Sequence, residues 1–178
     1  MTQPDVLIAG DGHSVAVRGS DGRLRIMRTA KDTFLVREWL AADADPRAAT
    51  DPALATGVSC DPDGCVSALG DGRLVALTLR PDAFADDCTR AAIIVTQQQA
   101  PSDCGAMVID RSRLQRQRGL ALRQAGEGFA VTAIRPEGID RPWSPMPSTA
   151  ATAPTTRRPR IAPPVDATPA EADRQADD

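Results

Sequence analysis

Two almost identical turn sequences constrain the fold of this chain more than any other feature. The eight residues from Ser20 (SDGRLRIM) resemble the eight residues from Gly70 (GDGRLVAL). Asp-Gly between alternating apolar residues is a strong short-range signal for a β-hairpin. The chain is therefore predicted to contain at least two hairpins. We interpret the similarity as repeated turn chemistry, with a duplicated unit as the alternative.

The remaining segments predict further short strands and few helices, which indicates a β-rich α+β fold. The apolar run Ile93-Ile94-Val95 is typical of a buried central strand. Strands are expected at 6–9, 14–18, 23–28, 58–60, 65–69, 73–79, 91–96, 107–109, 119–123 and 129–134. Helices are expected from Phe34 to about Ala42, capped by Asp32 or Thr33, from Pro81 through Asp87, and from Asp110 to Gln117. Residues 43–57 are expected to form a loop.

The composition changes near the C-terminus. Eight of the fifteen prolines lie from Pro142 onward, among Thr and Ala. Such a segment buries too little apolar surface to offset its ordering entropy. We therefore predict one domain over residues 1–147 and a disordered tail over residues 148–178.

The four cysteines suggest disulfide bonds. Cys60 and Cys65 flank Asp61-Pro62-Asp63-Gly64, a turn sequence that would bring the two sulfur atoms together. Cys88 and Cys104 flank a predicted strand and a loop, which allows a second bridge. Four cysteines permit three pairings, and we favour Cys60 with Cys65 and Cys88 with Cys104, with free thiols as the alternative. Zinc binding is disfavoured because the two C-x-x-C pairs typical of a zinc site are absent. These disulfides would indicate an oxidising compartment.

The candidate catalytic residues are few. The single histidine, His13, has only Asp11 and Ser14 nearby, so metal-dependent hydrolysis through several histidines is disfavoured. A hydrolase built on His13 and Asp11 is the least favoured hypothesis, and a loop histidine is the simpler interpretation. We expect no catalytic residue, no metal site and no cofactor.

Two acidic segments are also interpreted as structural. The sequence Asp61-Pro62-Asp63-Gly64 resembles the start of a calcium loop but lacks the later ligands, so we expect a plain turn. The adjacent carboxylates Asp86 and Asp87 could act as a general acid or base. A solvated helix end is the simpler prediction for them.

The charge balance excludes a strong global attraction to nucleic acid. The chain has 21 basic and 24 acidic residues, for a net charge of -3. One local cluster is basic, and it is the best candidate for contact with DNA phosphates. It consists of Arg111, Arg113, Arg116, Arg118 and Arg123. An ordinary solvated surface is the alternative.

Several segments together resemble the C-terminal soluble region of ComEC-family competence proteins of alphaproteobacterial type. They are PDVLIAGDGHSVAVRGSDGRLRIMRT (4–29), FLVREWLAADAD (34–45), GVSCDPDGC (57–65), DGRLVAL (71–77), DDCTRAAIIVT (86–96), VIDRSRL (108–114) and GIDRPWSP (138–145). The resemblance covers about residues 4–147 and is distributed rather than concentrated in one motif. It implies a metallo-β-lactamase-like sandwich of sheets with helices outside, on the periplasmic side of an inner-membrane channel that passes single-stranded DNA.

The chain departs from that family in two respects. The H-x-H-x-D-H motif that holds the metals is absent, so a nuclease activity cannot be transferred to this chain. The membrane-spanning channel is also absent, and the N-terminus shows no signal-peptide pattern.

The resemblance therefore predicts a degenerate, non-catalytic accessory domain for DNA uptake in natural transformation. The expected partners are a ComEC-type membrane channel segment, in cis or as a separate chain, and single-stranded DNA, without direct membrane insertion by this chain. The expected location is the periplasmic side of the inner membrane if the domain is attached to membrane spans, and the cytoplasm if it is expressed alone. A structural or protein-interaction domain without nucleic-acid binding is the alternative.

Overall fold

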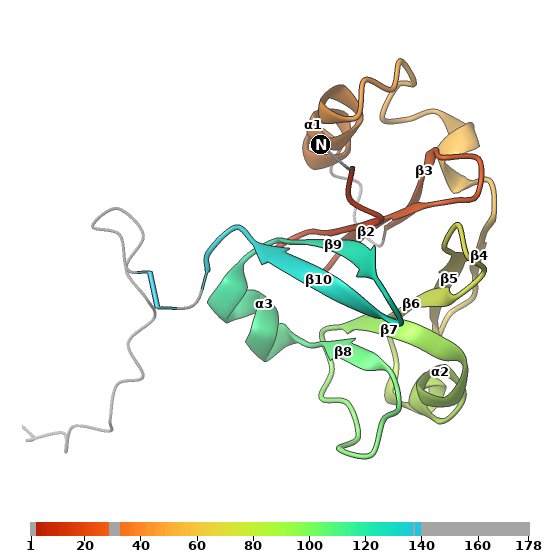
Figure 1. The fold of residues 1–178 in the computed structure, drawn as a ribbon. Coiled ribbons are helices and arrows are strands. Elements are labelled where there is room, and N and C mark those ends of the chain that lie inside the picture. Colours follow the sequence, from red (N-terminus) through yellow and green to blue (C-terminus); the bar gives the residue numbers. More distant parts are fainter. Residues whose placement is uncertain (1–2, 29–32, 137, 140–178) are drawn as a thin grey trace, which may run out of the picture. The chain divides into compact units, whose positions relative to one another are not determined.

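The computed structural model of the chain describes residues 3–28, 33–136 and 138–139, all within the unit formed by residues 1–147 (Figure 1). These residues form two five-stranded sheets and three α-helices, which confirms the predicted β-rich α+β class. The predicted tail, residues 148–178, lies outside the described residues.

The first sheet, sheet A, is antiparallel throughout. Its strand order is β10-β9-β1-β2-β3. The strands are β1 (Val6–Ile8), β2 (Ser14–Arg18), β3 (Leu24–Arg28), β9 (Leu120–Ala125) and β10 (Gly128–Ala133). Strands β1, β2 and β3 form a meander, in which the predicted turn at Ser20 joins β2 and β3, and β9 and β10 form a hairpin.

The second sheet, sheet B, is mixed. Its order is β4-β5-β6-β7-β8, with strands β4 (Val58–Cys60), β5 (Gly64–Ala68), β6 (Leu74–Thr78), β7 (Ala91–Thr96) and β8 (Met107–Ile109). The pairs β6–β7 and β7–β8 are parallel. Strand β7 lies between two neighbours, and Ile93, Ile94 and Val95 are fully buried, as the apolar run predicts.

The helices begin close to their predicted positions. They are α1 (Phe34–Ala42), α2 (Phe84–Arg90) and α3 (Arg111–Gln117), with short 3-10 helices η1 (Pro52–Ala55) and η2 (Pro81–Ala83). Thr33 occupies the N-cap position of α1, but its side chain makes no capping hydrogen bond. Asp32, the other predicted cap, lies outside the described residues.

The core lies between the two sheets, and a helix covers the outer face of each. The central cluster joins Val15 and Val17 of sheet A to Val75 and Leu77 of sheet B. On the outer face of sheet A, Ala16 and Ile26 pack against Val36 and Leu40 of α1. On the outer face of sheet B, Ala76 and Ile94 pack against Phe84 of α2. The layers therefore run helix, sheet, sheet, helix. Strand β2 of sheet A and strands β6 and β7 of sheet B make this possible, because they bury apolar side chains on both of their faces.

The two similar turns have the same geometry and lie against each other. In the first turn the N–H of Gly19 donates to the Arg23 carbonyl at 3.0 Å, and in the second turn the N–H of Leu69 donates to the Arg73 carbonyl at 2.8 Å. Gly22 and Gly72 both have positive φ, at 75° and 87°, which favours glycine at these positions. Each turn joins the second and third strands of a three-stranded meander that is followed by a helix. The two turns therefore have equivalent places in their meanders but not in their sheets, because β3 is the edge strand of sheet A and β6 is the central strand of sheet B.

Both predicted disulfides are present. Cys60 pairs with Cys65 across the β4–β5 hairpin, and Cys88 of α2 pairs with Cys104 in the loop before β8. The turn between Cys60 and Cys65 is closed by the Asp61 carboxylate, which accepts hydrogen bonds from the N–H groups of Asp63 and Gly64 at 2.8 and 2.9 Å. This arrangement confirms the plain turn that the sequence predicts.

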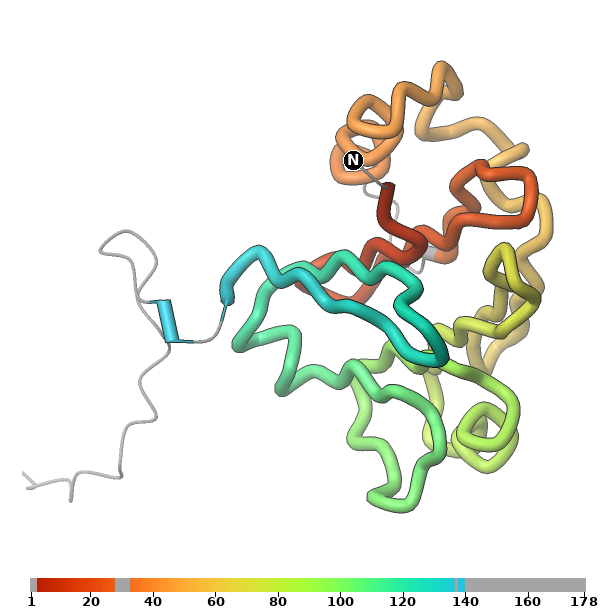
Figure 2. Tube along the Cα trace, viewed as in Figure 1, coloured from red at the N-terminus to blue at the C-terminus, as the bar shows by residue number. Residues whose placement is uncertain are grey.

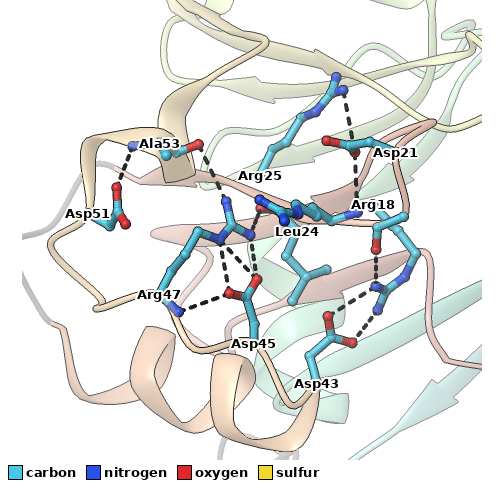
Figure 3. Close-up of polar contacts among 11 residues, drawn as sticks. Arg18, Asp21, Leu24, Arg25, Asp43, Asp45, Arg47, Asp51 and Ala53 are labelled. Carbon is cyan, nitrogen blue, oxygen red and sulfur yellow. Dashed lines mark hydrogen bonds and ion pairs between the residues drawn. The ribbon is translucent and has the colours of Figure 1, made fainter.

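A group of ion pairs fastens the segment between α1 and β4 to the edge of sheet A (Figure 3). Arg18 forms a bidentate ion pair with Asp43, in which Nη2 donates to Oδ1 at 2.7 Å and Nη1 donates to Oδ2 at 3.1 Å. Arg47 contacts Asp45 at 2.5 Å and donates to the Leu24 carbonyl of β3 at 2.8 Å. Figure 2 traces this segment, residues 43–57, from α1 to its entry into sheet B at β4. The loop that the sequence predicts here is therefore an ordered connection between the sheets.

Candidate functional site

A recess with polar side chains in its walls lies where the parallel strands of sheet B end. Because β6, β7 and β8 are parallel, Thr78, Thr96 and Ile109 end them at the same edge. Ligands of parallel sheets commonly bind at the carboxyl ends of the strands. The loop between β1 and β2 reaches this edge from sheet A, since Gly12 and His13 line the same recess as Thr78.

Two adjoining cavities form this recess, which we call the glutamine groove. One has a volume of about 380 Å³ and the other of about 320 Å³, and both are lined by Gln97 and Gln98. The groove is lined by Gly12, His13, Leu77, Thr78, Leu79, Gln97, Gln98, Gln99, Asp110, Arg111, Ser112 and Gln115. Four glutamine amides and the hydroxyls of Thr78 and Ser112 are among these residues, so the groove offers several hydrogen-bond donors and acceptors.

The glutamine segment is held in place at its first two residues. The Gln97 amide donates to the Asp11 carbonyl, and a Cβ on Gly12 would lie 2.3 Å from the same amide nitrogen. Gln98 donates its backbone N–H to the Thr96 hydroxyl at 3.0 Å, and that hydroxyl donates to the Thr78 carbonyl at 2.9 Å. Gln97 is thus half-buried, while Gln98 and Gln99 are exposed toward solvent.

Helix α3 forms the other wall of the groove, and Asp110 starts it. The Asp110 carboxylate accepts hydrogen bonds from the Arg113 N–H and the Ser112 hydroxyl, both at 2.8 Å. Burial raises the pKa of Asp110, but these hydrogen bonds outweigh it and leave the pKa below its ordinary value. The carboxylate therefore stays ionised and serves as the N-cap of α3.

The five predicted phosphate-contacting arginines are only partly brought together. Arg111, Arg113 and Arg116 lie on α3, and Arg118 follows it at the C-cap. Arg111 lines the groove, Arg113 donates to Gln117 at 3.0 Å, and Arg116 donates to Ser112 at 3.4 Å. Arg123 lies on β9, on the face of sheet A opposite to the buried Leu122. The cluster is thus a basic helix with Arg123 on a separate surface.

The β1–β2 loop holds the two residues of the hydrolase hypothesis, Asp11 and His13, in a backbone turn. The Asp11 carboxylate accepts a hydrogen bond from the backbone N–H of His13 at 2.9 Å, which is an Asx turn. His13 is exposed and lines the groove. Its position is that of the loop histidine that the sequence favours.

An acidic recess of about 280 Å³ lies beside the Cys60–Cys65 disulfide, and its carboxylates have local roles. Asp86 forms an ion pair with Arg90 at 2.9 Å, and Asp87 accepts a hydrogen bond from the Thr78 hydroxyl at 2.6 Å. The prediction of a solvated helix end fits Asp86, whereas Asp87 is half-buried. Across residues 3–28, 33–136 and 138–139, no group of three or more His, Cys, Asp or Glu side chains is arranged to hold a metal ion.

Sequence reasoning missed the glutamine groove. Its signal was the triplet Gln97-Gln98-Gln99 directly after the buried run Ile93–Val95, which places three amides at the carboxyl end of a central strand. The partner residues Ser112 and Gln115 join it only because β8 is parallel to β7 and places α3 beside the same edge. That pairing depends on long-range contacts.

In the described part of the chain, no helix is long and apolar enough to cross a membrane. Comparison with protein-family models, with curated proteins and with solved structures finds no match to this chain.

Proposed function

We propose that the chain is a non-catalytic binding module of ComEC type, which contacts single-stranded DNA through α3 and the adjoining glutamine groove. The observation that carries this proposal is the position of Arg111 in the wall of an amide-lined groove, on a helix with further arginines. Phosphate contact by the arginines would position the strand, and the amides would face its bases.

The charge on α3 supports this proposal. Residues 110–118 contain four arginines, Arg111, Arg113, Arg116 and Arg118, and one acidic residue, Asp110, which is used as the helix cap. The ion pairs recorded in the described part of the chain involve other arginines, for example Arg18 and Arg47. Four arginines outside those pairs give a local positive field despite the net charge of -3.

The groove supports binding rather than turnover. Gln amides carry both donors and acceptors and can pair with the edges of bases. The groove residues include no Phe, Tyr or Trp, and His13 has their one aromatic ring, so hydrogen bonds and phosphate contacts would provide most of the affinity.

Two further observations support the ComEC-type part of the proposal. Helices on the outer faces of two packed sheets give the layering that the resemblance implies. The two disulfides suit an oxidising compartment, as on the periplasmic side of a DNA channel. In this proposal the module acts beside the channel segment, either in cis or as a separate chain.

The proposal is tested by the binding of a fluorescently labelled single-stranded oligonucleotide to the full chain over a range of salt concentrations. The variant Arg111→Ala/Arg113→Ala/Arg116→Ala removes three charges from α3. If all three side chains contact phosphates, the slope of log K against log salt becomes smaller by about 2, at roughly 0.7 per contact to a single strand.

A matched control removes three exposed arginines elsewhere. Arg37→Ala/Arg80→Ala/Arg90→Ala changes the net charge by the same amount, and these side chains are 68, 63 and 64% exposed. The control should bind like the wild-type chain. Equal weakening in both variants, or no salt-dependent binding at all, would reject the DNA contact and favour a protein-interaction domain, for which a pull-down against the membrane channel segment is the direct test.

A further inference from the structure

Strand β10 presents the longest unprotected edge in the described part of the chain. It ends the order of sheet A, and its six residues, Gly128–Ala133 (GFAVTA), include no charged residue and no proline. Proteins usually protect exposed edges with short strands, charges, proline or a covering segment, because an open edge can pair with another chain. Strand β10 has none of the protections that lie within the strand itself.

The other strand edges are protected. Strands β4 and β8 have three residues each. Strand β3 carries Arg25, and Arg47 binds the Leu24 carbonyl along its edge. The contrast singles out β10 among the four edges of the two sheets.

The pairing of β10 with β9 determines which backbone groups point outward. Ile134 donates its N–H to the Gly119 carbonyl at 2.9 Å, in the same register that pairs Gly128 with Ala125. Antiparallel strands alternate between residues bonded to one neighbour and residues bonded to the other. The N–H and C=O groups of Phe129, Val131 and Ala133 therefore point away from β9.

We propose that β10 pairs antiparallel with β10 of a second copy of this chain, with Val131 opposite Val131 of that copy. In a two-fold symmetric antiparallel pair, the residue at the symmetry axis lies opposite itself in the second copy. Val131 can take this place, because its N–H and C=O groups point outward and it is the middle one of the three outward-pointing residues. Phe129 then pairs with Ala133 of the second copy, and Ala133 pairs with Phe129 of the second copy. Sheet A becomes a ten-stranded sheet that spans the dimer.

The side chains fit this register. Ile134, which is 77% exposed, lies opposite Gly128 of the second copy, where no side chain competes for space. The pairing ends beyond Ile134, because the Glu127 carbonyl already accepts a hydrogen bond from Arg73 at 2.9 Å and the Arg135 N–H donates to the Gln117 carbonyl at 3.1 Å.

A second copy suits this edge better than the C-terminal segment of the same chain. Eight prolines lie from Pro142 onward, and proline cannot donate to a strand ladder. An identical uncharged strand, by contrast, offers matched donors and acceptors. The dimer proposal is independent of the DNA contact proposed above.

The first test is the mass of the full chain in solution, by light scattering or sedimentation at about 100 µM, where a pair with a micromolar Kd is mostly associated. The wild-type chain should be a dimer. Ala133→Pro removes an outward N–H without touching the bonds to β9, and should weaken the dimer by roughly tenfold or more, since each copy loses one hydrogen bond. Ala133→Val keeps the N–H and should remain dimeric.

A second test addresses the register and does not depend on Ala133. Ala130 and Thr132 are exposed, and the proposed register places Ala130 opposite Thr132 of the second copy in a closely spaced pair. A mixture of Ala130→Cys and Thr132→Cys chains should form a disulfide-linked heterodimer on mild oxidation, well in excess of either chain alone. A monomeric wild-type chain would overturn the proposal. So would a dimer that is unchanged by Ala133→Pro, or one that cross-links equally without mixing.

Discussion

At the scale of single residues, hydrogen bonds stabilise three carboxylates of this domain in their ionised form. Asp45, Asp71 and Asp110 all have a pKa below the ordinary value of 3.8. Each is hydrogen-bonded by the backbone or side chain of an arginine two or three residues later. These short contacts fix turns and a helix start rather than assemble a reactive centre. These three acidic residues therefore mainly stabilise local turns and the start of a helix.

Asp45 gives a prediction for the pH dependence of stability. Its pKa is lowered mainly by the side-chain hydrogen bonds from Arg47, against the opposing effect of burial. A carboxylate with a lowered folded-state pKa stabilises the protein above its unfolded-state pKa, and that stability is lost as the pH falls through the folded-state value. Asp45→Asn should lower the free energy of unfolding by about 1–2 kcal/mol at pH 7, measured by urea denaturation. The difference from wild type should shrink below about pH 4.

A suitable control for this pH profile is Asp86→Asn. The Asp86–Arg90 ion pair is exposed, with side chains 69 and 64% accessible, so its loss should cost less than about 0.5 kcal/mol. An equally small effect of Asp45→Asn, or a constant effect from pH 7 to pH 3, would show that the ion pair with Arg47 does not stabilise the fold.

At the scale of elements, the two disulfides hold different structures. Cys60–Cys65 closes a hairpin that its turn already favours, whereas Cys88–Cys104 ties α2 to the loop that follows the glutamine segment. The second bridge spans 16 residues and the first spans 5. A longer closed loop restrains the unfolded chain more strongly. The Cys88–Cys104 bridge should therefore contribute more to stability.

This ordering can be measured with paired serine variants. Cys88→Ser/Cys104→Ser should lower the free energy of unfolding by about 3 kcal/mol, and Cys60→Ser/Cys65→Ser by about 2 kcal/mol, in urea titrations under oxidising conditions. Adding a reductant to the wild-type chain should reproduce the sum of the two losses. A larger loss from the Cys60–Cys65 pair would contradict this account, because hairpin geometry and not loop entropy would then dominate.

The elements also show which parts of the fold the sequence could predict. The hairpins at Ser20 and Gly70 follow from residues that are neighbours in the chain, so Asp-Gly turns and alternating side chains predict them. The helix before β7 is also predicted, since Pro81 opens it, although it runs to Arg90 rather than Asp87. Local chemistry was sufficient for these elements.

At the scale of the whole molecule, the assignment of strands to sheets was not predictable from local patterns. The chain leaves sheet A after β3 and enters sheet B at β4, and sheet A is completed only by β9 and β10 near the end of the domain. Valine and isoleucine in β2 and β7 indicate burial but do not specify a partner strand. The glutamine groove was missed for the same reason, because it needs β8 beside β7 and the β1–β2 loop beside Gln97.

The division into a folded domain and a tail gives the final prediction. Among the described residues, the three core clusters and both disulfides lie between Val6 and Ala133. Deleting residues 148–178 should therefore change Tm by less than about 2 °C in thermal unfolding followed by circular dichroism, because every one of these core residues and both disulfides are retained. The dimer mass should persist in the truncated chain, since β10 is retained. A large fall in Tm would show that the proline-rich segment contributes to the folded domain, against the boundary that its composition predicts.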